Sequence, residues 1–223
     1  MLHHPATFNL GHETRSVMNP PFDVKENYVL ENECVLMRPL QCDDLEHLLD
    51  FALKEPEIWK YSLVQAGGEE NMRRYINAAV ASREKCQHYP YIVFDKMSGA
   101  YAGTTRFCDI QLATQSMQMG YTWYGEKFQG SMVNRNCKYL LLEFAFEKMQ
   151  FERIEFRVDV QNERSLSSLL KLGCVMEGRL RKVGPAIDSE RRDCYVLSIL
   201  KDEWMSTVGP QLRLKLAARA VPL

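Results

Sequence analysis

The order of segments between residues 119 and 172 constrains the fold of this chain more than any other feature. A strand-like run at 119–124 is followed by the turn 127–134, an apolar helical segment at 137–149, a strand at 154–160 and a short helix at 163–172. A strand–helix–strand unit requires a parallel pairing of strands. The turn contains Gly130 and precedes a helix, so backbone N–H groups at the positive end of the helix dipole lack partners. This arrangement predicts a phosphate site, with a purely structural turn as the alternative.

The remaining segments predict one mixed sheet in a single domain. Strands at 91–94 and 101–107 form an antiparallel hairpin, because only the short connection 95–99 separates them. Further strands are expected at 33–39, 116–124, 174–182 and 193–200, and further helices at 43–54, 69–86 and from residue 204 onward. We therefore expect a poorly ordered leader at 1–26, one domain at 27–204 and a helical tail at 205–223.

The charge and the cysteine content argue against several functional classes. The net charge is −1, which gives no electrostatic reason to expect nucleic acid or an anionic membrane as a partner. No apolar run approaches the ~20 residues that span a bilayer. The seven cysteines are odd in number and dispersed, without the spacing of a zinc site or a redox pair. We therefore expect a cytoplasmic protein that holds no metal.

The turn 127–134, the run Asn162-Glu163-Arg164-Ser165 and the helix end Lys171-Leu172-Gly173 together resemble the GCN5-related N-acetyltransferase (GNAT) superfamily. The similarity is greatest to its ribosomal-protein-alanine and spermidine acetyltransferase branch and covers roughly residues 31–204. It implies an α/β (α+β) fold with a central mixed, mostly antiparallel sheet of about seven strands and helices on both faces. It also implies acetyl transfer from acetyl-CoA to a primary amine of a protein N-terminus, a polyamine or a small molecule. Because no cysteine has a histidine neighbour in the sequence, direct attack in a ternary complex is favoured.

The resemblance assigns a cofactor site to the turn. The family pattern falls on Lys127, Gly130 and Met132, and Met132 stands where the family usually has glycine or alanine. Backbone amides of the turn would hold the pyrophosphate of coenzyme A, and Lys127 or Arg135 would add charge. The preceding strand would bind the pantetheine arm through its main chain. The cofactor residues implied are thus Tyr121, Thr122, Trp123, Lys127, Gln129, Gly130, Ser131, Met132, Val133, Asn134 and Arg135.

Asn162 and Ser165 each have two interpretations. Asn162 is a good N-cap for the helix 163–172, and its apolar stripe needs no functional explanation. In the family, an asparagine at this place binds the pantetheine arm. Ser165 is either part of the cap or a hydroxyl that returns a proton to the coenzyme A sulfur. Both residues are therefore candidates for cofactor binding and for catalysis.

The acceptor side is predicted to be a groove between residues 55–68 and the loop 183–192. Its candidate substrate-binding residues are Trp59, Tyr61, Glu190 and Arg191, with burial in the core as the alternative for Trp59. An attacking amine must lose a proton, so a carboxylate is needed directly or through water. Asp188 is the catalytic candidate, and the other carboxylates considered are Glu155, Asp159, Glu190 and Asp193.

Two other functions stay open at this point. Met132 and the lack of an evident base are compatible with a non-catalytic acyl-CoA-binding module. An acyltransferase with a donor other than acetyl-CoA is equally compatible. The partners expected are acetyl-CoA and an amine, and a homodimer is compatible with all three functions.

Overall fold

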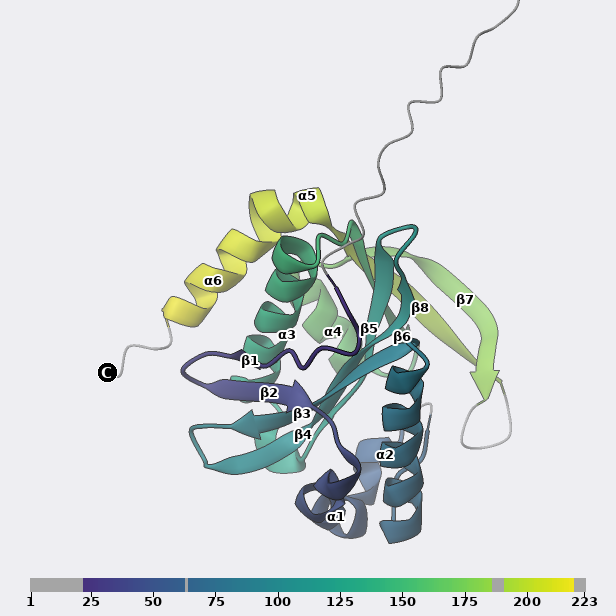
Figure 1. Cartoon of the computed structure of the whole chain (residues 1–223). Helices are drawn as coiled ribbons and strands as arrows, with labels where there is room; N and C mark the ends of the chain where they lie inside the picture. The colour runs from purple at the N-terminus through teal and green to yellow at the C-terminus, as the bar shows by residue number, and fades with distance from the viewer. Residues whose placement is uncertain (1–21, 63, 186–190, 219–223) are drawn as a thin grey trace, which may run out of the picture.

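The computed structural model describes residues 22–62, 64–185 and 191–218. Its centre is an eight-stranded sheet with the order β1-β2-β3-β4-β5-β6-β8-β7 (Figure 1). The strands are β1 (Leu30–Glu31), β2 (Val35–Pro39), β3 (His88–Asp95), β4 (Ala100–Gln111), β5 (Ser116–Tyr124), β6 (Arg153–Asp159), β7 (Val175–Pro185) and β8 (Arg191–Leu200). All neighbours pair antiparallel except β5 and β6, which are parallel. The predicted mixed, mostly antiparallel sheet is confirmed, with the two-residue β1 as an additional strand.

Helices cover both faces of the sheet (Figure 1). The helices are α1 (Leu45–Lys54), α2 (Glu69–Glu84), α3 (Val133–Glu143), α4 (Glu163–Leu172), α5 (Lys201–Glu203) and α6 (Gly209–Ala217). Two π-helical turns, Phe144–Lys148 and Trp204–Val208, extend α3 and join α5 to α6. The α3 helix begins at Val133, earlier than the expected start at residue 137, so the predicted turn includes its first residues.

Both ends of the described chain pack more tightly than the sequence predicts. Phe22 and Val24 are buried, and the Phe22 ring contacts Tyr28, Tyr89 and Phe151. The folded domain thus extends at least from residue 22, and the predicted leader boundary at 26 is too late. Residues 1–21 lie outside the described part.

The predicted C-terminal tail is part of the domain rather than an appendage. Leu212 of α6 is buried, and Arg213 donates a hydrogen bond to the Tyr139 hydroxyl of α3 at 2.9 Å. Leu214 is exposed. The alternation of buried and exposed leucines therefore places one face of α6 against α3.

The strands β5 and β6 pair over a short distance and then separate. Their register joins Ser116 to Arg153, Met117 to Ile154 and Gln118 to Glu155, with no further paired residues in the described part of the chain. On its other side, β5 has a β-bulge opposite β4 between Thr104 and Arg106. A bulge increases local twist and bends the strand. The divergence opens the centre of the sheet to both faces.

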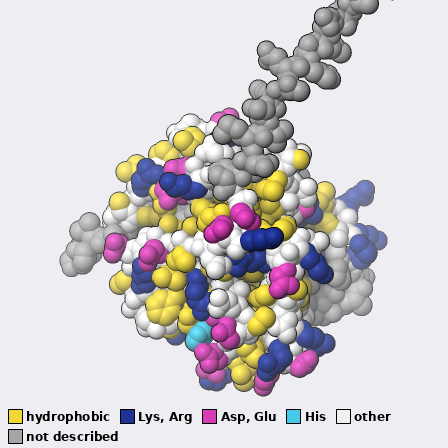
Figure 2. Space-filling model, in the orientation of Figure 1, with side chains coloured by type: hydrophobic (Ala, Val, Ile, Leu, Met, Phe, Trp, Pro, Cys, Tyr) yellow, Lys and Arg dark blue, Asp and Glu magenta, His cyan; other side chains and the backbone are white. Residues whose placement is uncertain are grey.

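The surface is mixed in charge, as the net charge of −1 predicts. Figure 2 shows basic and acidic side chains interspersed over the visible face, with apolar groups between them. Within the described residues, no helix is both long and apolar enough to cross a membrane.

Candidate active site

A cavity of about 800 Å³ occupies the gap between β5 and β6. One end lies against the N-terminus of α3 and the facing side of α4. The other end lies against residues 57–62 and β8. The cavity therefore connects the two faces of the sheet, and a long molecule can reach from the helix terminus to the opposite face.

The turn before α3 has the geometry of an anion cradle. Gly130 has φ +75°, a left-handed conformation that disfavours other residues, and a Cβ built there would meet no protein atom within 4 Å. The open space beside Gly130 allows a ligand to approach the backbone closely. The first N–H groups of α3 have no intrahelical partners, and they point to this space with the positive end of the helix dipole.

Side chains of the turn hold its shape. The Ser131 hydroxyl donates to the Phe128 carbonyl at 2.6 Å and accepts from the Val133 N–H at 3.2 Å. The Gln129 amide donates to the Tyr124 carbonyl at 2.9 Å, and its oxygen accepts a hydrogen bond from Arg164 of α4. The side chain of Gln129 thus ties β5 to α4, while Val133 is buried beneath the turn.

Two predicted cofactor residues do not line the cavity. Lys127 lies in a separate hollow lined by residues of α1 and β4, with its ammonium 4.7 Å from the Phe128 ring. A 3₁₀ turn, Glu126–Phe128, separates it from the cradle and directs it away. Met132 is the N-cap residue of α3, and its sulfur accepts a hydrogen bond from Arg135 at 3.8 Å. Arg135 does line the cavity.

Basic side chains line the groove between α3 and α4. Besides Arg135, they are Lys138, Arg164, Lys171 and Lys215, and no acidic residue of α3, α4 or α6 joins them among the described residues. The sequence analysis missed these four as ligand contacts. Helical spacing could have found two of them, because Lys138 lies four residues after Asn134 and Lys171 three after Ser168.

Lys138 has an unusual environment within this groove. Its ammonium lies 5.8 Å from the Phe156 ring, and burial lowers its pKa to about 8. The side chain of Asn134, one turn earlier, has a buried Oδ1 without a hydrogen-bond partner among the described residues. A polar molecule in the groove can satisfy both groups.

Asn162 and Ser165 lie together at the start of α4 and line the cavity. The Asn162 side chain accepts a hydrogen bond from the Ser165 N–H at 3.0 Å, which is N-cap geometry. Gly173 ends the helix in a left-handed conformation with φ +111°. The capping role of Asn162 is therefore present, and its place on the cavity wall leaves the second role as a proposal.

The β5 wall presents both main chain and side chains. Tyr121 occupies the left-handed region with φ +50°, and both Tyr121 and Thr122 line the cavity. The Thr122 hydroxyl lies 2.8 Å from that of Thr105. Trp123 is buried, and its indole N–H donates to the Tyr75 hydroxyl at 3.2 Å.

The far end of the cavity contains Tyr61, Asp159 and Arg192. Arg192 donates to the Tyr61 carbonyl at 3.0 Å and lies 3.5 Å from the Asp159 carboxylate. The side chains of Asp159 and Arg192 are 11% and 14% exposed, and Arg192 Nε is buried without a partner among the described residues. An unsatisfied buried donor is costly, so this end of the cavity is suited to a ligand oxygen.

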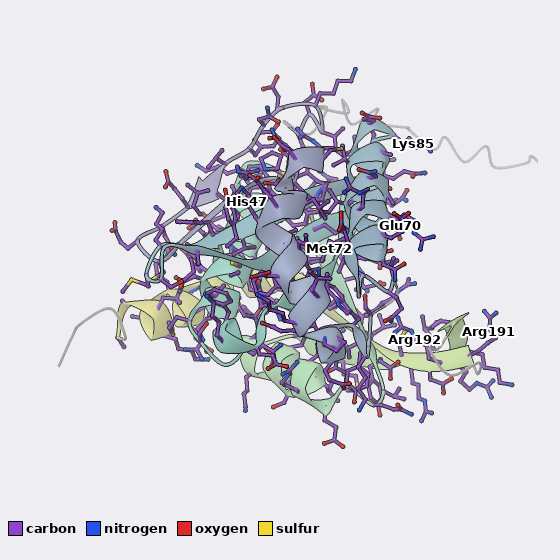
Figure 3. All side chains as sticks on the ribbon, turned by 90° about the horizontal axis from the view of Figure 1, so that it is seen from below. His47, Glu70, Met72, Lys85, Arg191 and Arg192 are labelled. Carbon is purple, nitrogen blue, oxygen red and sulfur yellow. The ribbon has the colours of Figure 1, made fainter. Side chains whose placement is uncertain are left out.

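The structure corrects the acceptor groove in one respect. Trp59 does not line the cavity; it is 1% exposed and packs edge-on against Trp123 at 4.7 Å. It is a core residue that supports the groove from behind. Arg191 is exposed at the outer end of the β7–β8 hairpin, with Arg192 closer to the body (Figure 3). Asp188 and Glu190 lie outside the described residues.

Two other carboxylates that the sequence offered are engaged elsewhere. Glu155 pairs with Arg153 at 3.0 Å and with Arg157 at 2.8 Å. Asp193 accepts from the Lys182 N–H and from Arg179, which lower the pKa of its carboxyl. Asp159 is thus the carboxylate that the described structure places at the far end of the cavity with substantial burial.

The fold and cavity define an α/β transferase-type domain in which a helix N-terminus meets a split between two parallel strands. The Acetyltransferase (GNAT) domain family matches residues 35–175, and the chain belongs to this family. The predicted superfamily is therefore confirmed. The class of enzyme is an acetyltransferase.

Comparisons with individual proteins agree with this family. The chain is 26% identical over 180 residues to "Probable N-acetyltransferase YjcK" of Bacillus subtilis (strain 168), covering 78% of this chain and 98% of that protein. A crystal structure from T. thermophilus, assigned as an acetyltransferase, is 30% identical with a TM-score of 0.76, covering 84% and 96% of the two chains. Mycobacterium smegmatis RimJ in complex with CoA-disulfide has the same fold, with 21% identity, a TM-score of 0.67 and coverage of 86% and 94%.

Proposed function

We propose that this protein transfers an acetyl group from acetyl-CoA to a primary amine. The observation that carries the proposal is the continuous cavity that joins the α3 cradle to the Tyr61–Arg192 end through the split sheet. A nucleotide thioester is long and has phosphates at one end and the reactive carbonyl at the other. The cavity has the matching polarity, with basic groups and helix N–H groups at one end and a buried carboxylate at the other.

The residues fit the phosphate end of this substrate. Gly130 leaves open space at the helix terminus, and Arg135 and Arg164 supply fixed positive charge. The unpartnered Asn134 Oδ1 can accept from an N–H group of the bound molecule. Met132 lies outside the cavity lining, so its long side chain does not occupy the cradle.

The residues also fit the thioester end. Beyond their pairing with β6, the residues of β5 from Gly120 to Trp123 line the cavity and can bind the pantetheine amides and the thioester carbonyl. The acceptor amine attacks the carbonyl carbon, the carbon–sulfur bond breaks and the sulfur takes a proton. Asp159 can receive the proton of the amine directly or through water, and Ser165 can donate to the departing sulfur. Asp188 stays a second candidate for the base.

The test is binding followed by turnover. We expect coenzyme A and acetyl-CoA to raise the melting temperature, and thiol release to follow with at least one amine among an N-terminally free alanyl peptide, spermidine and an amino-acid amide. Asp159→Asn should lower kcat by about 10²-fold or more, the range of general-base effects, with acetyl-CoA binding retained.

The outcomes separate the functions considered above. Binding of acetyl-CoA without turnover of any amine would instead favour a non-catalytic acyl-CoA module. Faster turnover with propionyl-CoA or succinyl-CoA would change the donor, and failure to bind coenzyme A would overturn the proposal. Unchanged kcat in Asp159→Asn would remove Asp159 as the base.

A further inference from the structure

Arg106 is a buried cation without a carboxylate partner. It lies on β4 and is 4% exposed, and no acidic group of residues 22–62, 64–185 or 191–218 forms an ion pair with it. Burial of an unpaired charge is unfavourable, and arginine keeps its proton under all ordinary conditions. A guanidinium in this position therefore requires an explanation beyond packing.

Aromatic rings take the place of a carboxylate. The guanidinium carbon lies 4.1 Å from the ring centroid of Tyr121 and 4.9 Å from that of Tyr75. Nη1 also lies 3.4 Å from His88 Nδ1, a long contact. Cation–π contacts stabilise the cation without neutralising it, so its field extends into the surroundings.

Tyr121 connects this cation to the cavity. Its ring covers Arg106 and lines the cavity, in the range of electrostatic interaction with Arg192. Its backbone is left-handed, which is strained for a bulky residue and persists only where surrounding contacts enforce it. Arg106 is thus about one aromatic ring away from a molecule bound at the acceptor end.

The other titratable groups near Arg106 do not neutralise it. The pKa of Tyr121 is raised by burial and that of the Cys108 thiol is raised to about 12, so both are neutral. Burial and then the charge of Arg106 lower the pKa of His88, which favours its neutral form. Asp109, three residues along β4, is exposed and accepts hydrogen bonds from Gln111 and Gln118.

The charges at the acceptor end itself nearly cancel. Arg192 lies beside Asp159, and Glu57 is exposed at the rim. Tyr75 of α2 hydrogen-bonds to Thr104 and to the Trp123 indole. Arg106 therefore contributes the unbalanced buried charge among the described residues of this region.

We propose that Arg106 is a positioning residue whose positive charge keeps the bound acceptor amine in its free-base form. The proposal rests on the proposed acetyl transfer. A like charge disfavours the ammonium form, and only the free amine can attack a thioester. Across about 8 Å at an effective dielectric constant of about 20, one charge shifts a pKa by roughly one unit. The proton leaves to solvent or to Asp159, and Arg106 itself exchanges none.

The test is the pH dependence of single-turnover rates at saturating acetyl-CoA and saturating alanyl peptide. The rate of the wild type should rise with pH along a limb that reports the bound amine. In Arg106→Met this limb should move up by roughly one pH unit, giving about tenfold slower transfer on the limb and the same plateau within about twofold. Arg106→Lys, which keeps the charge, should retain the wild-type profile.

A second measurement needs no substrate. Removal of the charge should raise the pKa of His88 in an NMR titration of Arg106→Met, because Arg106 helps to lower it. Arg74→Met, a change at an arginine on α2 whose side chain is 70% exposed, is the matched control and should move neither value.

Several results would overturn the proposal. A lower plateau with an unmoved limb would mean that Arg106 is structural. A rise in KM confined to carboxylate-bearing amines would mean that it binds an anion of the acceptor. If the wild type binds acetyl-CoA but acetylates no amine of the panel, the proposed function fails and this proposal fails with it. Turnover with an unshifted profile rejects this proposal alone.

Discussion

Arg38 and Arg106 occupy neighbouring parts of one sheet, and each guanidinium contacts tyrosine, but their surroundings differ. Arg38 on β2 donates to the Asp44 carboxylate at 2.9 Å and to the Tyr101 hydroxyl at 3.0 Å. Arg106 on β4 has tyrosine rings and a distant histidine instead. Arg38 is neutralised, whereas Arg106 is not.

The difference extends to the regions around the two residues. The antiparallel strands β1–β4 form a scaffold in which Asp44, 2% exposed, accepts from both Arg38 and the Gln41 N–H. The split between β5 and β6 collects unsatisfied groups. Of the four buried side-chain polar atoms without a partner among the described residues, Asn134 Oδ1 and Arg192 Nε belong to residues that line the cavity. Polar groups are thus arranged for stability in the scaffold and for a ligand at the split.

The largest expected effect is on stability in the scaffold. Arg38→Met leaves the buried Asp44 carboxylate unpaired and should lower the free energy of unfolding by about 3–5 kcal/mol in urea titrations. Arg106→Met should change it by less than about 1 kcal/mol, because the loss of cation–π contacts offsets the relief of an unpaired buried charge. The double variant Arg38→Met/Asp44→Asn should recover part of the loss. Similar losses in the two single variants would remove the distinction between the regions.

The second prediction concerns the cradle at the split. Gly130→Val places a branched side chain in the space beside the α3 terminus and should weaken coenzyme A binding at least about tenfold, the loss of one or more charge-assisted hydrogen bonds. Gly99→Val is the matched control, because Gly99 also has a positive φ, +65°, and open space around its Cβ. Calorimetry should show that both lose stability through backbone strain and that only Gly130→Val loses affinity. Equal affinities would place the phosphates elsewhere.

The sequence alone predicted the scaffold better than the side chains of the site. Alternating apolar residues and the strand–turn–helix order are local signals, and they placed most strands and the turn at Gly130 correctly. The orientation of Lys127 depends on a single 3₁₀ turn that has no strong sequence signal. The pattern of apolar residues could not decide between core and groove for Trp59, because an aromatic residue suits both.

Non-local contacts account for what could not be predicted from the sequence. Arg106 meets Tyr75 of α2 and Tyr121 of β5, and both contacts depend on the bulged register between β4 and β5. Arg192 reaches Asp159 across two strands that are adjacent in space but separated by α4 and β7 in the chain. The lack of a carboxylate partner for Arg106 among the described residues is a property of the packed structure alone.

The third prediction uses the lowered pKa of Lys138 at the split. Phosphate binding favours the protonated amine, so coenzyme A binding should take up a proton above pH 8 and none well below it. The affinity should accordingly fall several-fold as the pH rises from about 7 to 9.5. Lys138→Met should bind more weakly at pH 7 and lose this dependence, while Lys148→Met, a change at an exposed lysine after α3, should keep it. A wild-type affinity that is flat across pH 8 would separate Lys138 from the phosphates.

The smallest expected effect is at Asn162, where the scaffold role and the site role meet in one residue. Asn162→Ala removes the hydrogen bond to the Ser165 N–H and should cost about 1 kcal/mol of stability. Asn162→Ser keeps a capping hydroxyl but shortens the side chain, so it should retain most of the stability. If the amide also binds the pantetheine arm, both variants should raise the KM for acetyl-CoA about fivefold, the equivalent of about 1 kcal/mol. An unchanged KM in Asn162→Ser would leave capping as the whole role of this residue, and would place Asn162 with Asp44 among the groups that serve the fold.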